Sequence, residues 1–197
     1  MTPSSEFIAG LKILEPFLLS NGFKLDNMDT QQASGGQFTN ATYVNGKKKF
    51  IIGYRYSVGR LDYYFDNSVV MHNFYLDGLG YAGKMQYPNS QNEDLQTSFR
   101  HILTDFEYLK DDFFVGQCVE LKNIAISQIK YYEELQAKLY AEDELKNNKK
   151  IIDKARQQFK IKNYKSCIDM YKTVTKSYIL TEFDKTTLQR CNNHLTK

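Results

Sequence analysis

The sequence predicts an α+β protein: an antiparallel meander of three to four strands packed with helices in residues 1–115, then an all-α helical bundle in residues 116–197. All three prolines and every glycine except Gly116 lie in the first part, where aromatic residues alternate along short segments. The second part has no other glycine or proline, and its apolar residues repeat at helical spacing. At 197 residues the chain can bury a substantial core.

The two parts also differ in charge. Residues 1–115 carry 10 Lys and Arg against 13 Asp and Glu, a net of −3, and residues 116–197 carry 16 against 10, a net of +6. The formal total of +3 therefore conceals one acidic and one basic part. Opposite charges of this kind attract either each other or a partner of complementary charge.

The first element is a helix that ends at Asn21-Gly22, where glycine can adopt the left-handed cap. Pro16 predicts a kink or a restart within it, because proline lacks a backbone N–H. The apolar residues at helical spacing are Phe7, Leu11, Leu14 and Leu18.

The strongest local signal is a hairpin. Asn45-Gly46, the preferred pair for a two-residue type I′ turn, separates two alternating segments. We expect a second tight reversal at Val58-Gly59. The expected strands are Phe23–Gln31, Phe38–Val44, Lys49–Ser57 and Arg60–Phe65.

Two helices complete the first part. Asn67 can cap a short helix over Val69–Leu76, which Gly78 and Gly80 end. Further on, Ser90–Glu93 has the spacing of a capping box and precedes an apolar stripe from Leu95 to Phe106.

The second part predicts a long helix from Gly116 to Lys146, a length typical of a connecting or docking element. The polar run Lys146–Lys150 is the expected break. A final helix begins at Thr181, which has capping-box spacing to Asp184. It should bury Leu188, Cys191 and Leu195.

Residues 151–178 resemble a single tetratricopeptide-type helical hairpin. The resemblance rests on the packing residues of Ala155–Val174, namely Phe159, Tyr164, Cys167, Tyr171 and Val174. Asn163 stands at the usual glycine of the turn, and the closing proline is missing. Since one hairpin cannot bury a continuous core by itself, the resemblance implies that it packs on the preceding long helix.

The first part resembles a group of uncharacterised bacterial α+β proteins. The shared residues are Ser34–Phe38, Arg55–Gly59, His72, Tyr75 and Leu79-Gly80. The resemblance implies a fold and no chemistry. Bacterial immunity proteins, which neutralise toxins by binding them, often have a similar build, and this analogy suggests protein binding.

Metal and cofactor sites are not indicated. Gly78–Gly83 matches the letters of a dinucleotide fingerprint, but a helix rather than a strand precedes it, so we interpret it as a loop. Cys118, Cys167 and Cys191 match no metal or redox spacing and are expected to be reduced core residues. The chain starts without a signal-peptide pattern and has no apolar run of about 18 residues, which favours a cytoplasmic protein with no membrane span.

A contact surface is predicted near Val58-Gly59, because clustered Arg and Tyr are favoured at the centres of protein interfaces. Ordinary protection of a strand edge by charge is the other interpretation. The candidate protein-binding residues are Arg55, Arg60, Tyr63, Tyr64, His72 and Tyr75.

The leading functional hypothesis is a non-enzymatic bacterial protein that binds another protein, as an immunity-type inhibitor of a toxin or as an adaptor. One alternative is a small hydrolase or nuclease that uses His72 with Asp62, Asp66 or Asp77. The other is nucleic-acid binding by the basic C-terminal helices, whose lysines are interrupted by acidic residues.

Overall fold

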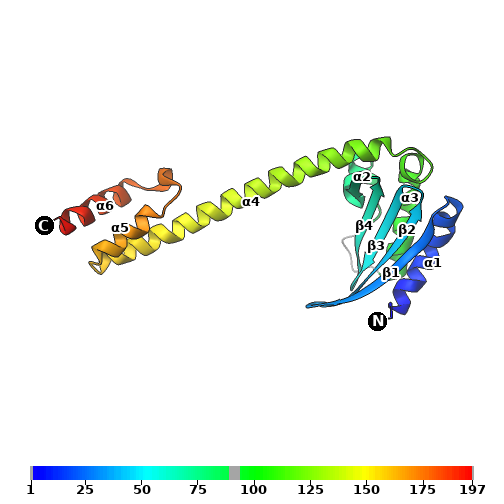
Figure 1. The fold of residues 1–197 in the computed structure, drawn as a ribbon, viewed down its shortest axis with the longest axis horizontal. Helices are drawn as coiled ribbons and strands as arrows, with labels where there is room; N and C mark the ends of the chain where they lie inside the picture. Colours follow the sequence, from blue (N-terminus) through cyan, green and yellow to red (C-terminus); the bar gives the residue numbers. More distant parts are fainter. Residues whose placement is uncertain (1, 89–93, 197) are drawn as a thin grey trace. The chain divides into compact units, whose positions relative to one another are not determined.

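The computed structural model describes residues 2–88 and 94–196, and it confirms the predicted α+β class (Figure 1). Five antiparallel strands form one sheet in the order β1-β2-β3-β4-β5. The chain divides into two compact units, Met1–Lys130 and Tyr131–Lys197. The units meet inside a long helix, beyond the predicted boundary at residue 115. No helix in the described ranges is both long and apolar enough to cross a membrane.

The sheet is a meander with one strand more than the three or four predicted. Its strands are β1 (Lys24–Ala33), β2 (Gly36–Asn45), β3 (Lys48–Tyr54), β4 (Val58–Phe65) and β5 (Ser68–Met71). β5 forms where a helix was predicted over Val69–Leu76. Asp66, with φ of 50°, helps to reverse the chain so that Ser68 pairs with Phe65, and the β-branched Val69 and Val70 extend this pairing. Helix α2 (His72–Gly78) therefore starts later than predicted.

Both predicted turns shift along the chain. The β2–β3 hairpin is confirmed, but its central pair is Gly46-Lys47, because Asn45 pairs with Lys48. Positive φ occurs at Gly46 and not at Lys47, which excludes the predicted type I′ turn. The second reversal lies at residues 55–57, and Gly59 falls inside β4 at an irregularity in its pairing with β3.

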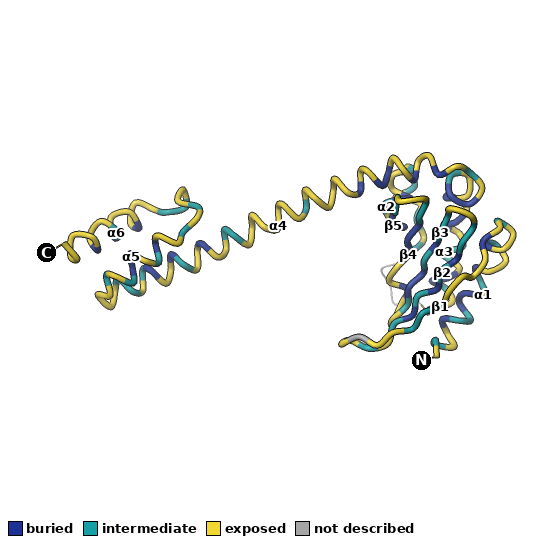
Figure 2. Tube along the Cα trace, viewed as in Figure 1, coloured by how far each residue is buried: buried dark blue, intermediate teal, exposed yellow. Residues whose placement is uncertain are grey.

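One face of the sheet carries the core of the first unit. Helices α1 (Ser5–Ser20) and α3 (Leu95–Leu109) lie on this face (Figure 1). Phe50 of β3 contacts Phe106 of α3 edge to face, with ring centroids 5.3 Å apart. The inward side chains of the three central strands are buried (Figure 2): Ala41, Tyr43, Phe50, Ile52, Leu61 and Tyr63.

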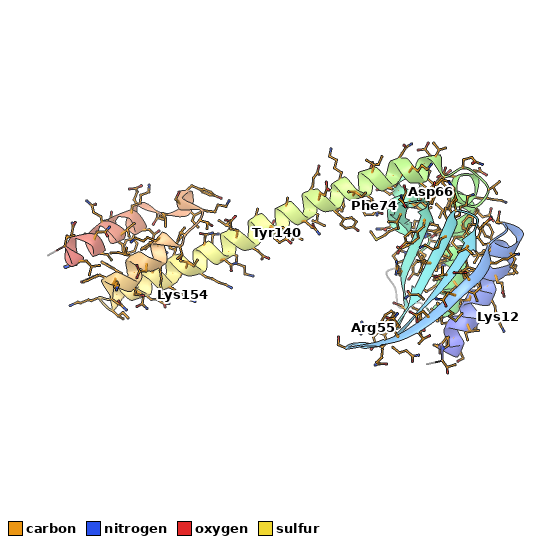
Figure 3. All side chains as sticks on the ribbon, in the orientation of Figure 1. Lys12, Arg55, Asp66, Phe74, Tyr140 and Lys154 are labelled. Atoms are coloured by element: carbon orange, nitrogen blue, oxygen red, sulfur yellow. The ribbon has the colours of Figure 1, made fainter. Side chains whose placement is uncertain are left out.

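Helix ends follow local chemistry. α1 continues through Pro16 without a restart and ends at Asn21-Gly22 as predicted. The carbonyl that loses its helical partner belongs to Lys12, which is exposed (Figure 3), so water can satisfy it. The N-cap of α3 is Asp94, whose carboxylate accepts from Thr97 N–H at 3.0 Å. The predicted capping box at Ser90–Glu93 lies outside the described residues.

A tight junction joins α3 to the long helix α4 (Val119–Lys160). It contains a π-helical turn, η2 (Lys110–Phe114), and Cys118 with φ of 56°. Asp112 caps α4 by accepting from Glu120 N–H at 3.1 Å and Leu121 N–H at 2.8 Å. This cap fixes the start of α4 on the first unit.

The side chain of Gln128 fixes α4 further along. Its amide accepts from Met71 N–H at 2.9 Å and donates to the carbonyl of Val69 at 3.4 Å, so the helix covers the outer edge of β5.

The predicted break at Lys146–Lys150 is wrong, since α4 runs through it without interruption. The segment contains no glycine or proline, and Asn148 bonds to the Thr175 and Lys176 N–H groups at 2.7 and 3.4 Å, which ties the following loop to the helix.

The second unit packs the end of α4 with α5 (Tyr164–Lys172) and α6 (Glu182–Leu195). The capping box between Thr181 and Asp184 is confirmed. Leu195 is 54% exposed, contrary to prediction, because it lies in the last turn of α6. The buried core consists of Ile152, Ala155, Cys167, Ile168, Tyr171 and Cys191.

Candidate functional site

The sheet face opposite α1 and α3 is not covered by a helix of the first unit (Figure 1). The pairing of the strands places Asn40, Gly53 and Arg60 in one row across this face. Arg55 lies at the end of the sheet away from Asp66 (Figure 3). An antiparallel sheet commonly has one solvated face of this kind, and its side chains are available for contact.

The β3–β4 turn is attached to the neighbouring hairpin. The Tyr56 hydroxyl donates to the carbonyl of Gly35 at 2.5 Å. The Arg55 guanidinium lies 5.4 Å from the centroid of the Tyr56 ring. The Arg55 guanidinium also lies against Gly35, where a Cβ would come within 1.5 Å of its Nη2. Arg55 therefore lies between the turn and the β1–β2 hairpin.

Arg60 is oriented by two neighbours on its own strand. Its Nε donates to Asp62 Oδ2 at 2.5 Å, and its Nη2 donates to the Tyr64 hydroxyl at 2.8 Å. Partial burial alone would lower the pKa of Arg60, but the hydrogen bond and charge of Asp62 raise it above its usual value. The guanidinium is therefore a fixed positive charge on the open face.

Two hollows adjoin at this position and share Gly59 and Arg60. The larger has a volume of about 660 Å³, within the range of ligand pockets, and the smaller about 250 Å³. The larger is also lined by Val58, Leu61, Asp62, Met71, His72, Asn73, Met85, Tyr87 and Pro88. The smaller is also lined by Phe38, Asn40, Gly53, Tyr54 and Arg55. We call Arg55, Gly59, Arg60 and Tyr64, with these hollows, the Arg60 rim.

Three of the six predicted contact residues lie in the interior instead. Tyr63 and Tyr75 are fully buried, and His72 is 4% exposed. Their positions follow from the pleat and from the start of α2: Tyr63 faces the core, and α2 turns Tyr75 towards Asp112, to which its hydroxyl donates at 2.5 Å. Burial raises the pKa of both tyrosines. Arg55, Arg60 and Tyr64 remain accessible from solvent.

His72 has a carboxylate partner, but none of the three that the sequence suggested. Its Nε2 lies 3.1 Å from Asp105 Oδ2, and its Nδ1 lies 2.8 Å from the Tyr63 hydroxyl. Asp62 instead pairs with Arg60, and Asp66 pairs with Lys47 at 3.2 Å.

Asp105 is fully buried on α3 and also accepts from the N–H groups of Gln86 and Tyr87, at 2.7 and 2.8 Å. It was missed because it lies 33 residues from His72 in sequence. The sequence did contain one sign of its role: Asp105 lies on the apolar stripe of its helix, between Ile102 and Phe106, where a carboxylate must be buried and needs partners.

The hydrogen bonds of His72 with Asp105 and Tyr63 are suited to stabilising the fold more than to acid–base catalysis. Both ring nitrogens of His72 contact buried groups, so neither is directed at a substrate in the larger hollow.

The cysteine thiols are buried as well, and burial raises the pKa of Cys118 to about 11 and that of Cys167 to about 12. Cys167 and Cys191, although distant in sequence, both belong to the buried core of the second unit. Within the described ranges, no group of three His, Cys, Asp or Glu side chains could hold a metal ion.

The fold and the site define an α+β protein with a half-open antiparallel sheet, a fixed arginine and adjoining hollows. The chain matches no family model, no curated protein and no solved structure.

Proposed function

We propose that this chain is a non-enzymatic protein that acts by binding another protein through the Arg60 rim, as an immunity-type inhibitor of a toxin or as an adaptor. The observation that carries the proposal is that two hollows share Arg60: the smaller lies beside Asn40 and Gly53 of the open face, and the larger lies along Val58–Leu61 of β4, which β5 does not pair. Arg in a preformed pocket beside Tyr is typical of the residues that dominate binding energy.

The long helix also presents apolar side chains to solvent. Several large ones on α4 are exposed, and side chains of this kind mark an interaction surface where they gather in one patch. Tyr140, shown in Figure 3, is 74% exposed. The others include Ile126, Ile129 and Leu139, at 70%, 58% and 52%.

The basic C-terminal helices carry exposed lysines, among them Lys149, Lys150 and Lys154, of the kind that contact a phosphate backbone. Arg156 is not one of these contacts, because it pairs with the buried Asp184 at 2.7 Å. The exposed carboxylates of Glu142, Asp143 and Asp153 interrupt the basic surface, which favours protein binding over nucleic-acid binding.

Arg60→Glu is expected to weaken binding of the partner by about 30-fold or more, the effect of losing roughly 2 kcal/mol at an interface hot spot. The full chain, carrying an affinity tag, is purified from its native cells after chemical crosslinking, and the captured protein is identified and then titrated against each variant. Lys12→Glu is the matched control, since it makes the same charge change at an exposed position on α1.

The expected pattern is a specific captured protein that binds the wild type and Lys12→Glu equally and binds Arg60→Glu weakly. Equal binding of all three would contradict the assignment of the rim, and the capture of no specific protein would contradict protein binding itself.

A further inference from the structure

Gly59 is the extra residue at the irregularity of the β3–β4 pairing, a usual place for glycine, but neither its φ nor the space around it requires one. Its φ lies outside the left-handed region, and a Cβ built on it meets no atom within 4 Å. Gly53 is different, because a Cβ there would lie 2.6 Å from Asn40 Oδ1 and 2.9 Å from Arg60 Cβ. A glycine inside a strand often marks the close approach of another molecule, and Gly59 borders both hollows.

The two hollows differ in chemistry. The smaller has donor groups from Asn40, Arg55 and Arg60, has aromatic walls and is lined by no carboxylate. The larger is mainly apolar, and methionines such as Met71 and Met85 can adapt to the shape of a ligand. Its one lining carboxylate, Asp62, already accepts from Arg60 Nε.

Arg60 retains capacity to bind an anion. The two hydrogen bonds that orient it use Nε and Nη2. Within the described chain its Nη1 forms no hydrogen bond, so this nitrogen can donate to a ligand. With Arg55 beside it, the rim carries two guanidinium groups against the single carboxylate of Asp62. Guanidinium groups favour carboxylates, which they can bind through charge-assisted hydrogen bonds.

We propose that the hollows on either side of Gly59 form one binding site for an amphipathic carboxylate. The acid group binds in the smaller hollow, beside Arg55 and Arg60, and the apolar body lies against Met71 and Met85 in the larger one. The inference rests on the proposed function: on a partner protein, the ligand is an acidic residue adjacent to an apolar or aromatic one. Gly59 lets this segment cross the strand without a steric barrier.

The test uses 3-phenylpropanoate and its neutral isostere 3-phenylpropanamide as probes. Each is titrated into the full chain, labelled with ¹⁵N, while the backbone amide signals of Gly53 and Gly59 are followed. We expect a saturable shift with the acid and at least a tenfold weaker response with the amide. Equal responses to both probes, or no response to the acid, would overturn the proposal.

Variants at Gly59 distinguish a blocked binding site from a disrupted fold. Gly59→Val should remove acid binding and Gly59→Ala should weaken it, with the rest of the spectrum unchanged, because an added Cβ meets no atom within 4 Å. Arg60→Lys keeps the charge but loses the planar donor group, so it should weaken acid binding several-fold. Undiminished acid binding by Gly59→Val would also overturn the proposal.

The two proposals can fail separately. If the acid does not bind but the captured protein still distinguishes Arg60→Glu from the wild type, the ligand chemistry is wrong and protein binding stands. If the acid binds and no protein is captured, the site serves a small molecule and the proposed function is wrong. Displacement of the captured protein by 3-phenylpropanoate would support both.

Discussion

Asp184→Asn is expected to lower the free energy of unfolding of the second unit by about 3 kcal/mol, the scale for breaking a buried ion pair. Asp184 is fully buried, and its carboxylate accepts from Arg156 Nε and Nη2 at 2.7 and 2.8 Å. It also accepts from the Tyr171 hydroxyl at 2.8 Å and from Thr181 N–H and Oγ1 at 2.9 and 2.6 Å. The side-chain amide of Asn would place its two N–H hydrogens against Arg156, Tyr171 and Thr181, which are themselves hydrogen-bond donors here, so some of these bonds would be lost.

The measurement is native-state hydrogen exchange in denaturant, with α5 and α6 followed separately from the sheet. Asp169→Asn is the matched control, because Asp169 is exposed on α5 and should change stability by no more than about 0.5 kcal/mol. Equal effects of the two variants on the exchange of α6 would refute the assignment.

The same carboxylate makes the second unit sensitive to acid. Burial alone would raise the pKa of Asp184, but hydrogen bonds from Arg156 and Thr181 outweigh burial and lower it below the usual value of 3.8. A group whose pKa is depressed by folding stabilises the folded state above its ordinary pKa, and this stabilisation is lost as the pH falls below that value. The wild type should therefore lose stability in the second unit below about pH 4, while Asp184→Asn should show a flatter profile. Parallel pH profiles would exclude this linkage.

The sequence predicted those parts of the fold that depend on local chemistry. Asn45-Gly46 located a hairpin because its turn requires positive φ, and the cap of α6 was evident from Thr181 and Asp184. β5 was missed because four residues, Ser68–Met71, are too few to show a period, and the pairing with β4 decides their conformation. The polar run at Lys146–Lys150 is typical of a break in sequence, yet nothing in it prevents a helix, and Asn148 gains tertiary hydrogen bonds.

The candidate site was predictable only where its residues are neighbours in sequence. Arg55 and Arg60 were identified because they flank one turn. The hollows beside them depend on segments that meet only in the fold, since Asn40 comes from β2 and Met85 and Tyr87 come from the loop before α3. The sequence also did not show which of the candidate side chains are exposed. Adjacent residues of β4 point to opposite faces of the sheet, so Tyr63 is buried while Tyr64 is not.

A buried hydrogen-bond network supports the wall of the larger hollow. Asp105 holds the N–H of Tyr87 and the ring of His72, and both of these residues line that hollow. The Tyr87 hydroxyl in turn donates to the carbonyl of Val58. The shape of the hollow therefore depends on a carboxylate that does not line it.

Asp105→Ala should destabilise the first unit by about 3–5 kcal/mol, because it leaves two backbone N–H groups and the ring of His72 without their buried acceptor. The measurement is hydrogen exchange of the sheet amides, with Asp77→Asn as the control. Asp77 is exposed at the end of α2 and was one of the carboxylates that the sequence suggested for His72.

Asp105→Ala should also weaken the binding of 3-phenylpropanoate several-fold under conditions in which the chain remains folded, because Tyr87 loses its anchor. Gln86→Ala is the control for this second effect, since only the backbone of Gln86 contacts Asp105. A variant that loses stability but binds the acid as tightly as the wild type would show that the hollow forms independently of the network, and Asp105 would then act on folding alone.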